Sequence, residues 1–353
     1  MNTNPELSQD LADSSLNPQL RVFFVMKDLF TSSSYVLIIS HQGPDGDSIG
    51  SSVALARYLK KLNVKSHILF PDPFPSYYDW LLEGEDFTVA NLDSERLSSL
   101  FDKGDLICCL DFNHLYRCGD ILHPLVKKHE TDTLVIDHHT YPEHFSKYEF
   151  IDDSASSTCE LIYRLVQESK DLDLIDQSIS EAIYTGLVTD TGSFKFSSTS
   201  SYTHQVASQL MKTSFNHTLI QQRISDENSI SRLHLLGYAL QKIVVNTELS
   251  LAYLLLTDKE LKRFDFKKGD TEGFVNYALS IKGVKVAVFV REDESIFKFS
   301  FRSKGKIKVN DFAKFYYNGG GHENAAGGSS QLMNHEKITQ ELIENFKKYC
   351  QGQ

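Results

Sequence analysis

The sequence predicts an α/β protein of two domains, with a doubly wound, mostly parallel sheet in its N-terminal half. Three observations predict this class. Short apolar runs alternate with helical patterns, which is typical of a parallel sheet covered by helices on both faces. The 353 residues, 41% hydrophobic and 24% charged, are enough for two globular domains. Polar side chains directly follow several apolar runs, as they do where parallel strands open into a ligand crevice.

The helices and strands expected in the first half follow from apolar runs and from the Gly- and Pro-rich segments that interrupt them. Strands are predicted at residues 35–39, 64–70, 106–110 and 135–136. Helices are predicted at residues 19–30, from a glycine- and proline-rich turn through about residue 62, at 156–168 and from about 178. The strand segments are rich in Val, Ile and Leu, and the helical segments space their apolar residues three and four apart.

Composition excludes several classes of protein. No apolar run approaches the roughly 20 residues of a membrane span, and the polar N-terminus lacks the features of a secretory signal. The five cysteines form no C-x-x-C pair, so we expect reduced core residues in a cytoplasmic protein. The net charge of -11 argues against a protein that grips long duplex nucleic acid through many phosphate contacts.

The turn after residues 35–39 contains His41, Asp45 and Asp47. Gly46 permits the sharp turn that lets the two carboxylates face the same ions. Without a cation these negative charges would repel each other. The alternative is that Asp47 or Ser48 caps the following helix. A cap explains one of these residues, but it does not explain His41 and Asp45 as well.

Further side chains that could bind a metal ion follow later strands and helices. Asp111 follows the run at 106–110, and Asp137-His138-His139 follows the β-branched run at 135–136. A solvated loop with two incidental histidines is the alternative for the second motif. Asp190 ends an apolar helix, where it is costly to bury unless paired or metal-bound, although it could equally be a C-terminal turn residue. The planar fork of Arg117 could bind a phosphate, and a surface ion pair is the alternative.

Together these positions form a mixed set of imidazoles and carboxylates. Its members are His41, Asp45, Asp47, Asp111, His138 and Asp190. Six such ligands fit two adjacent divalent ions, and histidine beside carboxylate favours manganese over an all-oxygen magnesium site. Two ions about 4 Å apart form the clamp used for phosphoryl displacement, with a shared water as the nucleophile.

In this chain order, the motifs His41-x-x-x-Asp45-x-Asp47, Asp111, Asp137-His138-His139 and Asp190 resemble those of the DHH phosphoesterase superfamily. The resemblance implies that one ion binds His41, Asp45 and Asp111. The other ion would bind Asp47, Asp111, His138 and Asp190, so that Asp111 bridges the two. It also implies that Asp137 orients an imidazole and that His139 faces the scissile phosphate.

The second half predicts a smaller α/β region. Strands are predicted at 249–256, 284–290 and 296–303, and a helix at 309–316. The run Gly319-Gly320-Gly321-His322 is predicted to be a loop whose backbone N–H groups can approach an anion. With Arg302 and the Ala-Ala-Gly-Gly continuation, it resembles the DHH-associated C-terminal substrate domain.

That resemblance divides the chain into a catalytic domain (1–215), a helical linker (216–243) and a substrate-binding domain (244–353), with the active site in the cleft. Size and motifs are most similar to the bifunctional oligoribonucleases and 3′-phosphoadenosine 5′-phosphate phosphatases. Short oligonucleotides and nucleoside bisphosphates would then be substrates, held by Arg302, the glycine loop and His322. Three alternatives remain: a cyclic or linear dinucleotide hydrolase, a silent nucleotide-binding regulator, and a scaffold. The sequence allows a homodimer without specifying one.

Overall fold

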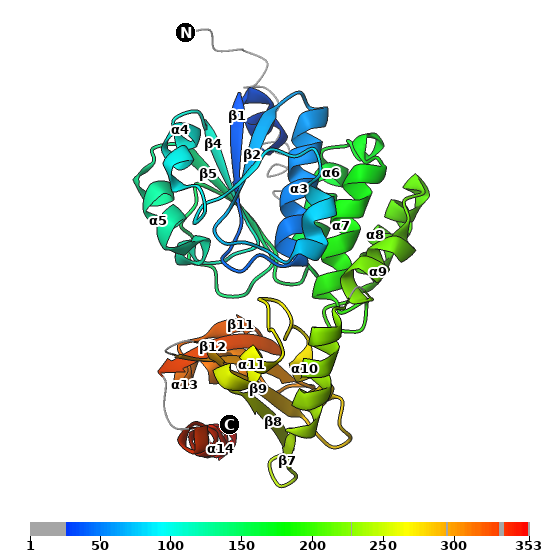
Figure 1. Cartoon of the computed structure of the whole chain (residues 1–353). Coiled ribbons are helices and arrows are strands. Elements are labelled where there is room, and N and C mark those ends of the chain that lie inside the picture. The colour runs from blue at the N-terminus through cyan, green and yellow to red at the C-terminus, as the bar shows by residue number, and fades with distance from the viewer. Residues whose placement is uncertain (1–25, 227, 294–295, 332–334, 352–353) are drawn as a thin grey trace. The chain divides into compact units, whose positions relative to one another are not determined.

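The computed structural model describes residues 26–226, 228–293, 296–331 and 335–351. The chain forms two compact units whose boundary falls between residues 227 and 228, and each is described by itself (Figure 1). Helix α9 (His217–Ser225) therefore lies in the first unit and α10 (Ile230–Gln241) in the second, so the predicted linker at 216–243 is shared between them. Of the helix predicted at 19–30, the first part lies outside the described residues, and residues 26–32 are helical.

The first unit contains a six-stranded sheet in the order β3-β2-β1-β4-β5-β6, and every neighbouring pair is parallel. Its strands are β1 (Tyr35–Ile39), β2 (Lys65–Phe70), β3 (Phe87–Val89), β4 (Leu106–Leu110), β5 (Asp132–Asp137) and β6 (Tyr148–Ile151). The strand order reverses between β1 and β4, where connections turn to opposite sides. This confirms the predicted doubly wound sheet. The short strands β3 and β6 were not predicted, because neither has an extended apolar run.

Helices cover both faces of this sheet (Figure 1). One core contains Val36 and Ile38 of β1, and the other contains Leu37 and Ile39, as expected for side chains that alternate along a strand. The first core includes residues of α3 (Gly46–Lys61), α6 (Thr158–Glu168), α7 (Gln177–Asp190), α8 (Ser201–Leu210) and α9. The second includes residues of α4 (Leu97–Phe101) and α5 (Gly119–Lys128). Short 3₁₀ helices lie at Ser76–Leu82, Ser94–Arg96, Leu115–Cys118, Leu172–Leu174 and Met211–Thr213.

The close packing of α3 against α6 and α7 depends on two glycines. A Cβ atom at Gly50 would lie 2.6 Å from the backbone oxygen of Ala182, inside van der Waals contact. A Cβ atom at Gly186 would lie 2.5 Å from Oδ1 of Asp47 and would also collide with Cys159. The obstacle at Gly50 is backbone, which cannot move as a flexible side chain can, and the obstacles at Gly186 are buried side chains. These glycines therefore set how closely the helices that carry Asp47 and Asp190 approach each other.

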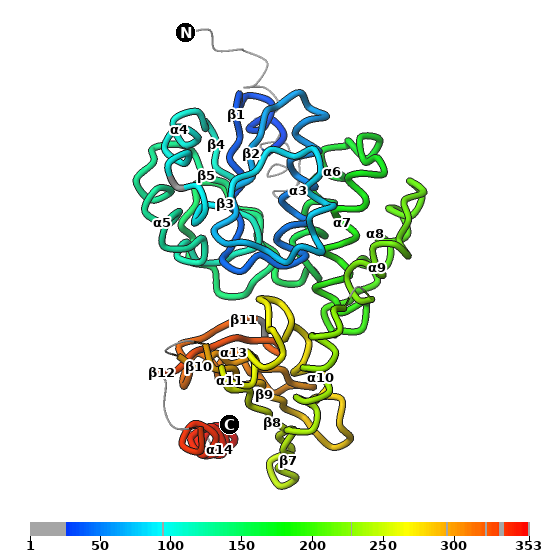
Figure 2. The backbone as a smooth tube through the Cα atoms, in the orientation of Figure 1, coloured from blue at the N-terminus to red at the C-terminus, as the bar shows by residue number. Residues whose placement is uncertain are grey.

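The second unit is a mixed six-stranded sheet in the order β11-β12-β10-β9-β8-β7 (Figure 2). Its strands are β7 (Val244–Asn246), β8 (Leu251–Leu256), β9 (Val286–Asp293), β10 (Ile296–Ser303), β11 (Gly320–His322) and β12 (Ala325–Gln331). Only β8 and β9 pair in parallel among these described strands. One core joins the sheet to α10, α11 (Asp258–Arg263) and α12 (Phe274–Leu279), and the other joins it to α13 (Val309–Tyr316) and α14 (His335–Gln351).

The glycine run is not the loop that the sequence predicted. Gly320, Gly321 and His322 form the edge strand β11, which pairs antiparallel with β12 so that Gly320 lies opposite Gly327 and Gly321 opposite Ala326. A Cβ atom at Gly319 would collide with the backbone of Gly327, and one at Gly321 would lie 2.5 Å from the backbone oxygen of Ala325. Gly320 is different, because a Cβ atom there would meet nothing within 4 Å. Backbone crowding therefore explains why residues 319 and 321 are glycines, whereas at Gly320 there is room for a side chain.

Among the residues that the structure describes, no helix combines the length and the apolar character needed to cross a membrane.

The crossing of α3 and α7 leads to a test of stability. Gly50→Ala places a methyl group against the backbone of Ala182, so we expect the free energy of unfolding to fall by about 1–3 kcal/mol. The matched control is Gly237→Ala in α10, where a Cβ atom would meet nothing within 4 Å. That change should stabilise its helix by roughly 0.5–1 kcal/mol.

Urea unfolding followed by circular dichroism measures both variants. Equal stability of Gly50→Ala and the wild type would show that the helices do not approach as closely as this packing requires.

Candidate metal centre

Three neighbouring parallel strands deliver the polar residues of the site. His41 follows β1, Asp111 follows β4, and His138 and His139 follow β5, so they gather at the carboxyl ends of strands where the strand order reverses. All four side chains are buried. Burial of so many polar groups is costly unless they bind partners. The fold therefore concentrates ligating groups at its natural crevice.

The start of α3 adds two carboxylates. Asp45 is the N-cap of this helix, and its Oδ1 accepts hydrogen bonds from the backbone N–H groups of Asp47 (3.1 Å) and Ser48 (3.0 Å). The cap is thus neither Asp47 nor Ser48, the two residues that the alternative interpretation suggested. Asp47 lies in the first turn and is fully buried. A Cβ atom on the intervening Gly46 would collide with Thr189 and lie 2.7 Å from the Tyr78 hydroxyl, so only glycine fits this turn.

His41, Asp45 and Asp111 form a first group of potential ligands whose donor atoms all lie within 4.8 Å of one another. Nε2 of His41 is 3.3 Å from Oδ2 of Asp111 and 3.8 Å from Oδ1 of Asp45. Nδ1 of the same ring lies 2.9 Å from the backbone oxygen of Gln42, which holds the ring with Nε2 toward the carboxylates.

Asp47, His138 and Asp190 form a second group within the same 4.8 Å limit. Nε2 of His138 is 3.1 Å from Oδ2 of Asp190 and 3.7 Å from Oδ2 of Asp47. It is also 3.5 Å from Oδ1 of Asp111. Asp111 therefore presents Oδ2 toward the first group and Oδ1 toward the second. The residue itself has a left-handed backbone with φ 67°, a conformation uncommon outside glycine.

Residues at the N-terminus of helix α6 donate hydrogen bonds to two of these carboxylates. The backbone N–H groups of Thr158 and Cys159 donate to Oδ2 (2.6 Å) and Oδ1 (2.9 Å) of Asp47. The Thr158 hydroxyl donates to Oδ1 of Asp111 at 3.0 Å. Thr158 was not among the site residues predicted from the sequence. The signal was a Ser-Thr pair at the start of a predicted helix, a capping pattern that leaves N–H groups available for an anion.

Asp137 orients His139. Its Oδ1 lies 2.7 Å from Nδ1 of His139, so the contact to Asp137 is made by Nδ1 of that ring and not by Nε2. His138 is held differently, with Nδ1 3.3 Å from the backbone oxygen of Ala155. Asp137 is fully buried, and its Oδ2 has no hydrogen-bond partner among the described residues. Of the two adjacent imidazoles, His139 is thus the one that Asp137 holds.

The electrostatics of this site call for added positive charge. Burial and the neighbouring charges of Asp111 and Asp190 raise the pKa of Asp47 well above its usual range. Burial also raises the pKa of Asp45 to about 6 against the opposing effect of His41. Because 44% of the Asp45 side chain is exposed, water stabilises its charged form, whereas the fully buried Asp47 has no such stabilisation. Without a cation, protons would have to neutralise these groups.

Asp111 behaves in the opposite way. Burial by itself would raise its pKa, but hydrogen bonds from His138 and His41 outweigh burial and hold the pKa of Asp111 well below its usual range. Correspondingly, burial lowers the pKa of His138, and Asp111 and Asp190 more than reverse this effect, so its pKa lies well above the usual range. Imidazoles and carboxylates that compete for protons in this way match the mixed donor set of divalent transition metals.

Arg117 lies beside the centre. Its backbone oxygen accepts a hydrogen bond from the N–H of Gln42 at 2.7 Å. Burial lowers the pKa of His139, and the positive charge of Arg117 lowers it further against the opposing effect of Asp137. The same charge opposes the rise in the pKa of His41. A cation at this place suits a phosphate.

The predicted substrate residues of the second unit lie at one end of its sheet. Arg302 is in β10 opposite Ala325 of β12, and its Nη1 donates to the backbone oxygen of Phe301 at 3.0 Å. Gly319 precedes β11, and Gly320, Gly321 and His322 form it. The side chain of His322 lies outside the described part of the structure.

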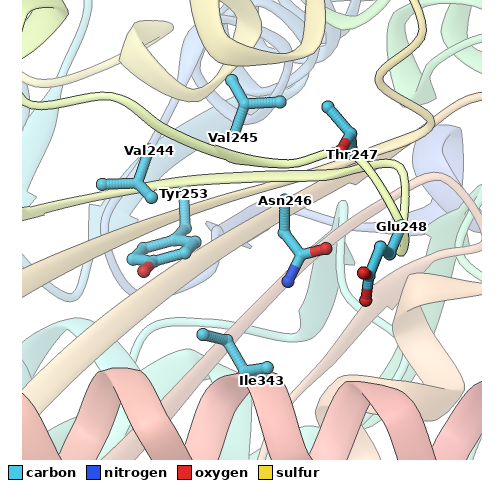
Figure 3. A pocket seen from close by; sticks show the side chains of 7 residues that line it. All are labelled: Val244, Val245, Asn246, Thr247, Glu248, Tyr253 and Ile343. Carbon is cyan, nitrogen blue, oxygen red and sulfur yellow. The ribbon is translucent and has the colours of Figure 1, made fainter.

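Two pockets differ in the residues that line them. One, of about 410 Å³, borders His139 and is otherwise lined by Pro142, His144, Glu149, Ile151, Asp152 and Asp153. The other, of about 350 Å³, lies in the second unit between the β7–β8 hairpin and Ile343 of α14 (Figure 3). It contains none of the predicted site residues. The chemistry of the side chains, and not the size of a hollow, identifies the functional site.

Comparison with known proteins agrees with these features. Residues 35–187 match the DHH family, N-terminal domain, and residues 248–351 match the DHHA1 domain. The chain is 28% identical over 305 residues to the bifunctional oligoribonuclease and PAP phosphatase NrnA of Bacillus subtilis, covering 85% of this chain and 91% of that protein. It is 30% identical over 311 residues to the uncharacterized protein MG371 of Mycoplasma genitalium, covering 87% and 90% respectively.

A solved structure extends the likeness to the fold. The crystal structure of an exopolyphosphatase-related protein from Bacteroides fragilis superposes with a TM-score of 0.88 at 34% sequence identity, covering 95% of this chain and 98% of that one. The resemblance inferred from the motifs is thereby confirmed. With both domain matches and relatives that align over most of its length, this chain belongs to the DHH family and carries a DHH N-terminal domain and a DHHA1 domain.

Proposed function

We propose that this protein is a metal-dependent phosphoesterase that degrades short oligoribonucleotides to mononucleotides and dephosphorylates 3′-phosphoadenosine 5′-phosphate. The observation that carries the proposal is the pair of ligand groups that share the Asp111 carboxylate at the ends of β1, β4 and β5. Support for the substrates comes from the full-length relative named as an oligoribonuclease and PAP phosphatase. The chain's net charge of -11 favours small anions over long duplex nucleic acid.

The proposed cofactors are two divalent ions, with Mn²⁺ as the best match. His41, Asp45 and Asp111 would hold one ion, and Asp47, Asp111, His138 and Asp190 the other. Histidine and carboxylate together suit a transition metal. Burial and the charges of Asp111 and Asp190 raise the pKa of Asp47, an effect that a bound cation would oppose. When bound, such a pair of ions polarises the phosphoryl group and lowers the pKa of a water molecule.

The chain's own residues supply binding and orientation. Asp137 holds Nδ1 of His139, and Nε2 of the same ring would donate to an oxygen of the phosphate that carries developing charge. Arg117, beside the two imidazoles, would bind another oxygen of the same phosphate. In the second unit, Arg302 and the open backbone at Gly320 would hold a terminal phosphate or the next nucleotide. We also propose a cytoplasmic location, which the proposed substrates and the free cysteines, four of them buried, support.

A substrate panel tests the proposal directly. Purified protein with Mn²⁺ should release mononucleotides from oligoribonucleotides of a few residues and phosphate from 3′-phosphoadenosine 5′-phosphate, and a chelator should abolish both activities. Turnover of cyclic or linear dinucleotides alone would replace the proposed substrates. Binding of nucleotides without any turnover would favour the regulator.

The bridging residue provides a second test. Asp111→Asn keeps the shape of the side chain but removes the charge that both ligand groups share, so we expect kcat to fall by roughly 10³-fold or more, equivalent to several kcal/mol of transition-state stabilisation. Steady-state kinetics at saturating Mn²⁺ measures this change. Activity within a few-fold of the wild type would contradict the shared-ligand assignment.

Arg302 tests the separate role of the second unit. Arg302→Ala should raise KM about tenfold or more, because a charged hydrogen bond to phosphate contributes roughly 1.5–3 kcal/mol. Mn²⁺ affinity, measured by titration calorimetry, should stay unchanged. The matched control is Arg291→Ala on the neighbouring strand β9, where the arginine pairs with Asp293 and stacks on Phe266. An unchanged KM for Arg302→Ala, or equal effects of the two variants, would rule out the proposed contact.

A further inference from the structure

We propose that Thr158 is a positioning residue that sets the orientation of the bridging carboxylate and thereby determines metal affinity. The proposal rests on the metal-dependent function proposed above. Thr158 is fully buried at the start of α6 and makes two hydrogen bonds to the centre. Its hydroxyl donates to Oδ1 of Asp111 at 3.0 Å, and its N–H donates to Oδ2 of Asp47 at 2.6 Å. One residue outside the ligand set therefore holds two carboxylates of that set.

The backbone and the side chain of Asp111 are restrained by different partners. The N–H of Asp111 donates to the backbone oxygen of Ile136 at 3.0 Å, which continues the sheet pairing of β4 with β5. The carboxylate could still rotate about the Cβ–Cγ bond. Oδ2 must face His41, at 3.3 Å, while Oδ1 faces His138, at 3.5 Å. The Thr158 hydroxyl is the neutral donor that restrains this rotation, since it bonds one oxygen without competing for a proton.

The start of α6 is itself held rigidly, as a positioning element must be. The Ser157 side chain caps the helix by accepting from the N–H of Glu160 at 3.0 Å. The buried Glu160 carboxylate accepts from the hydroxyls of Ser156 and Thr203, both at 2.6 Å, and the second bond ties α6 to α8. The first N–H groups of a helix have no partner within it, and here Asp47 takes two of them.

The experiment measures Mn²⁺ affinity by titration calorimetry on protein stripped with a chelator, and kcat and KM at saturating Mn²⁺. Thr158→Val removes the hydroxyl and keeps the branched shape. We expect its Mn²⁺ affinity to fall 10–100-fold, as for other residues that orient metal ligands through hydrogen bonds. Thr158→Ser keeps the hydroxyl and should restore affinity to within a few-fold of the wild type. The matched control is Thr185→Val. In the wild type the buried hydroxyl of Thr185 donates to the Glu181 carbonyl in its own helix.

Two results would overturn the proposal: wild-type Mn²⁺ affinity in Thr158→Val, or an equal loss in the serine and valine variants. The second would mean that side-chain volume, and not the hydroxyl, matters. If the valine variant does not fold, Thr158→Ala removes the hydroxyl without a branched side chain and gives the same comparison. Because Mn²⁺ binding is measured without substrate, this inference can hold even if the proposed substrates are not cleaved, and it can fail while they are.

Discussion

Four carboxylates and three imidazoles converge at this centre, most of them buried, and the excess of negative charge among them is the constraint on which the centre depends. Crowding of this kind raises the pKa of Asp47 well above its usual range, while hydrogen bonds from His138 and His41 hold that of Asp111 well below it. Divalent cations would offset the negative charge of several of these carboxylates at once, without requiring that the carboxylates be protonated. The surrounding protein can be understood as the scaffold that keeps these groups close despite their repulsion.

Each layer of the first unit contributes to this scaffold. Strands β1, β4 and β5 are neighbours in the parallel sheet and end at the same edge. The chain therefore places His41, Asp111 and His138 together although they are far apart in the sequence. The N-terminus of α6 directs backbone N–H groups at Asp47, which offsets part of the cost of burying a negative charge. Close helix packing at Gly50 and Gly186 then brings α3 and α7 near enough for Asp47 and Asp190 to share one imidazole.

Much of this arrangement was predictable from the sequence, because strand ends are marked by apolar runs that stop at polar residues. His41, Asp111 and His138 were found in this way. The cap at Asp45 was not, because Asp45, Asp47 and Ser48 are all residue types that cap helices and the local pattern does not choose among them. The contacts of Thr158 were not found either, because they depend on tertiary geometry that a local pattern does not contain. The glycine run was predicted as a loop because glycine is a poor strand former. Residues 320–322 instead form an edge strand that pairs with β12, and the backbone of β12 lies so close that no side chain fits at Gly319 or Gly321.

The most direct test of the central claim is an anomalous difference map from crystals of the wild-type protein grown with Mn²⁺. The account predicts two peaks about 4 Å apart. One should be bounded by His41, Asp45 and Asp111, and the other by Asp47, His138 and Asp190, with Asp111 contacting both. A single peak, or ions bound without Asp111, would contradict the shared carboxylate as the organising feature of this site.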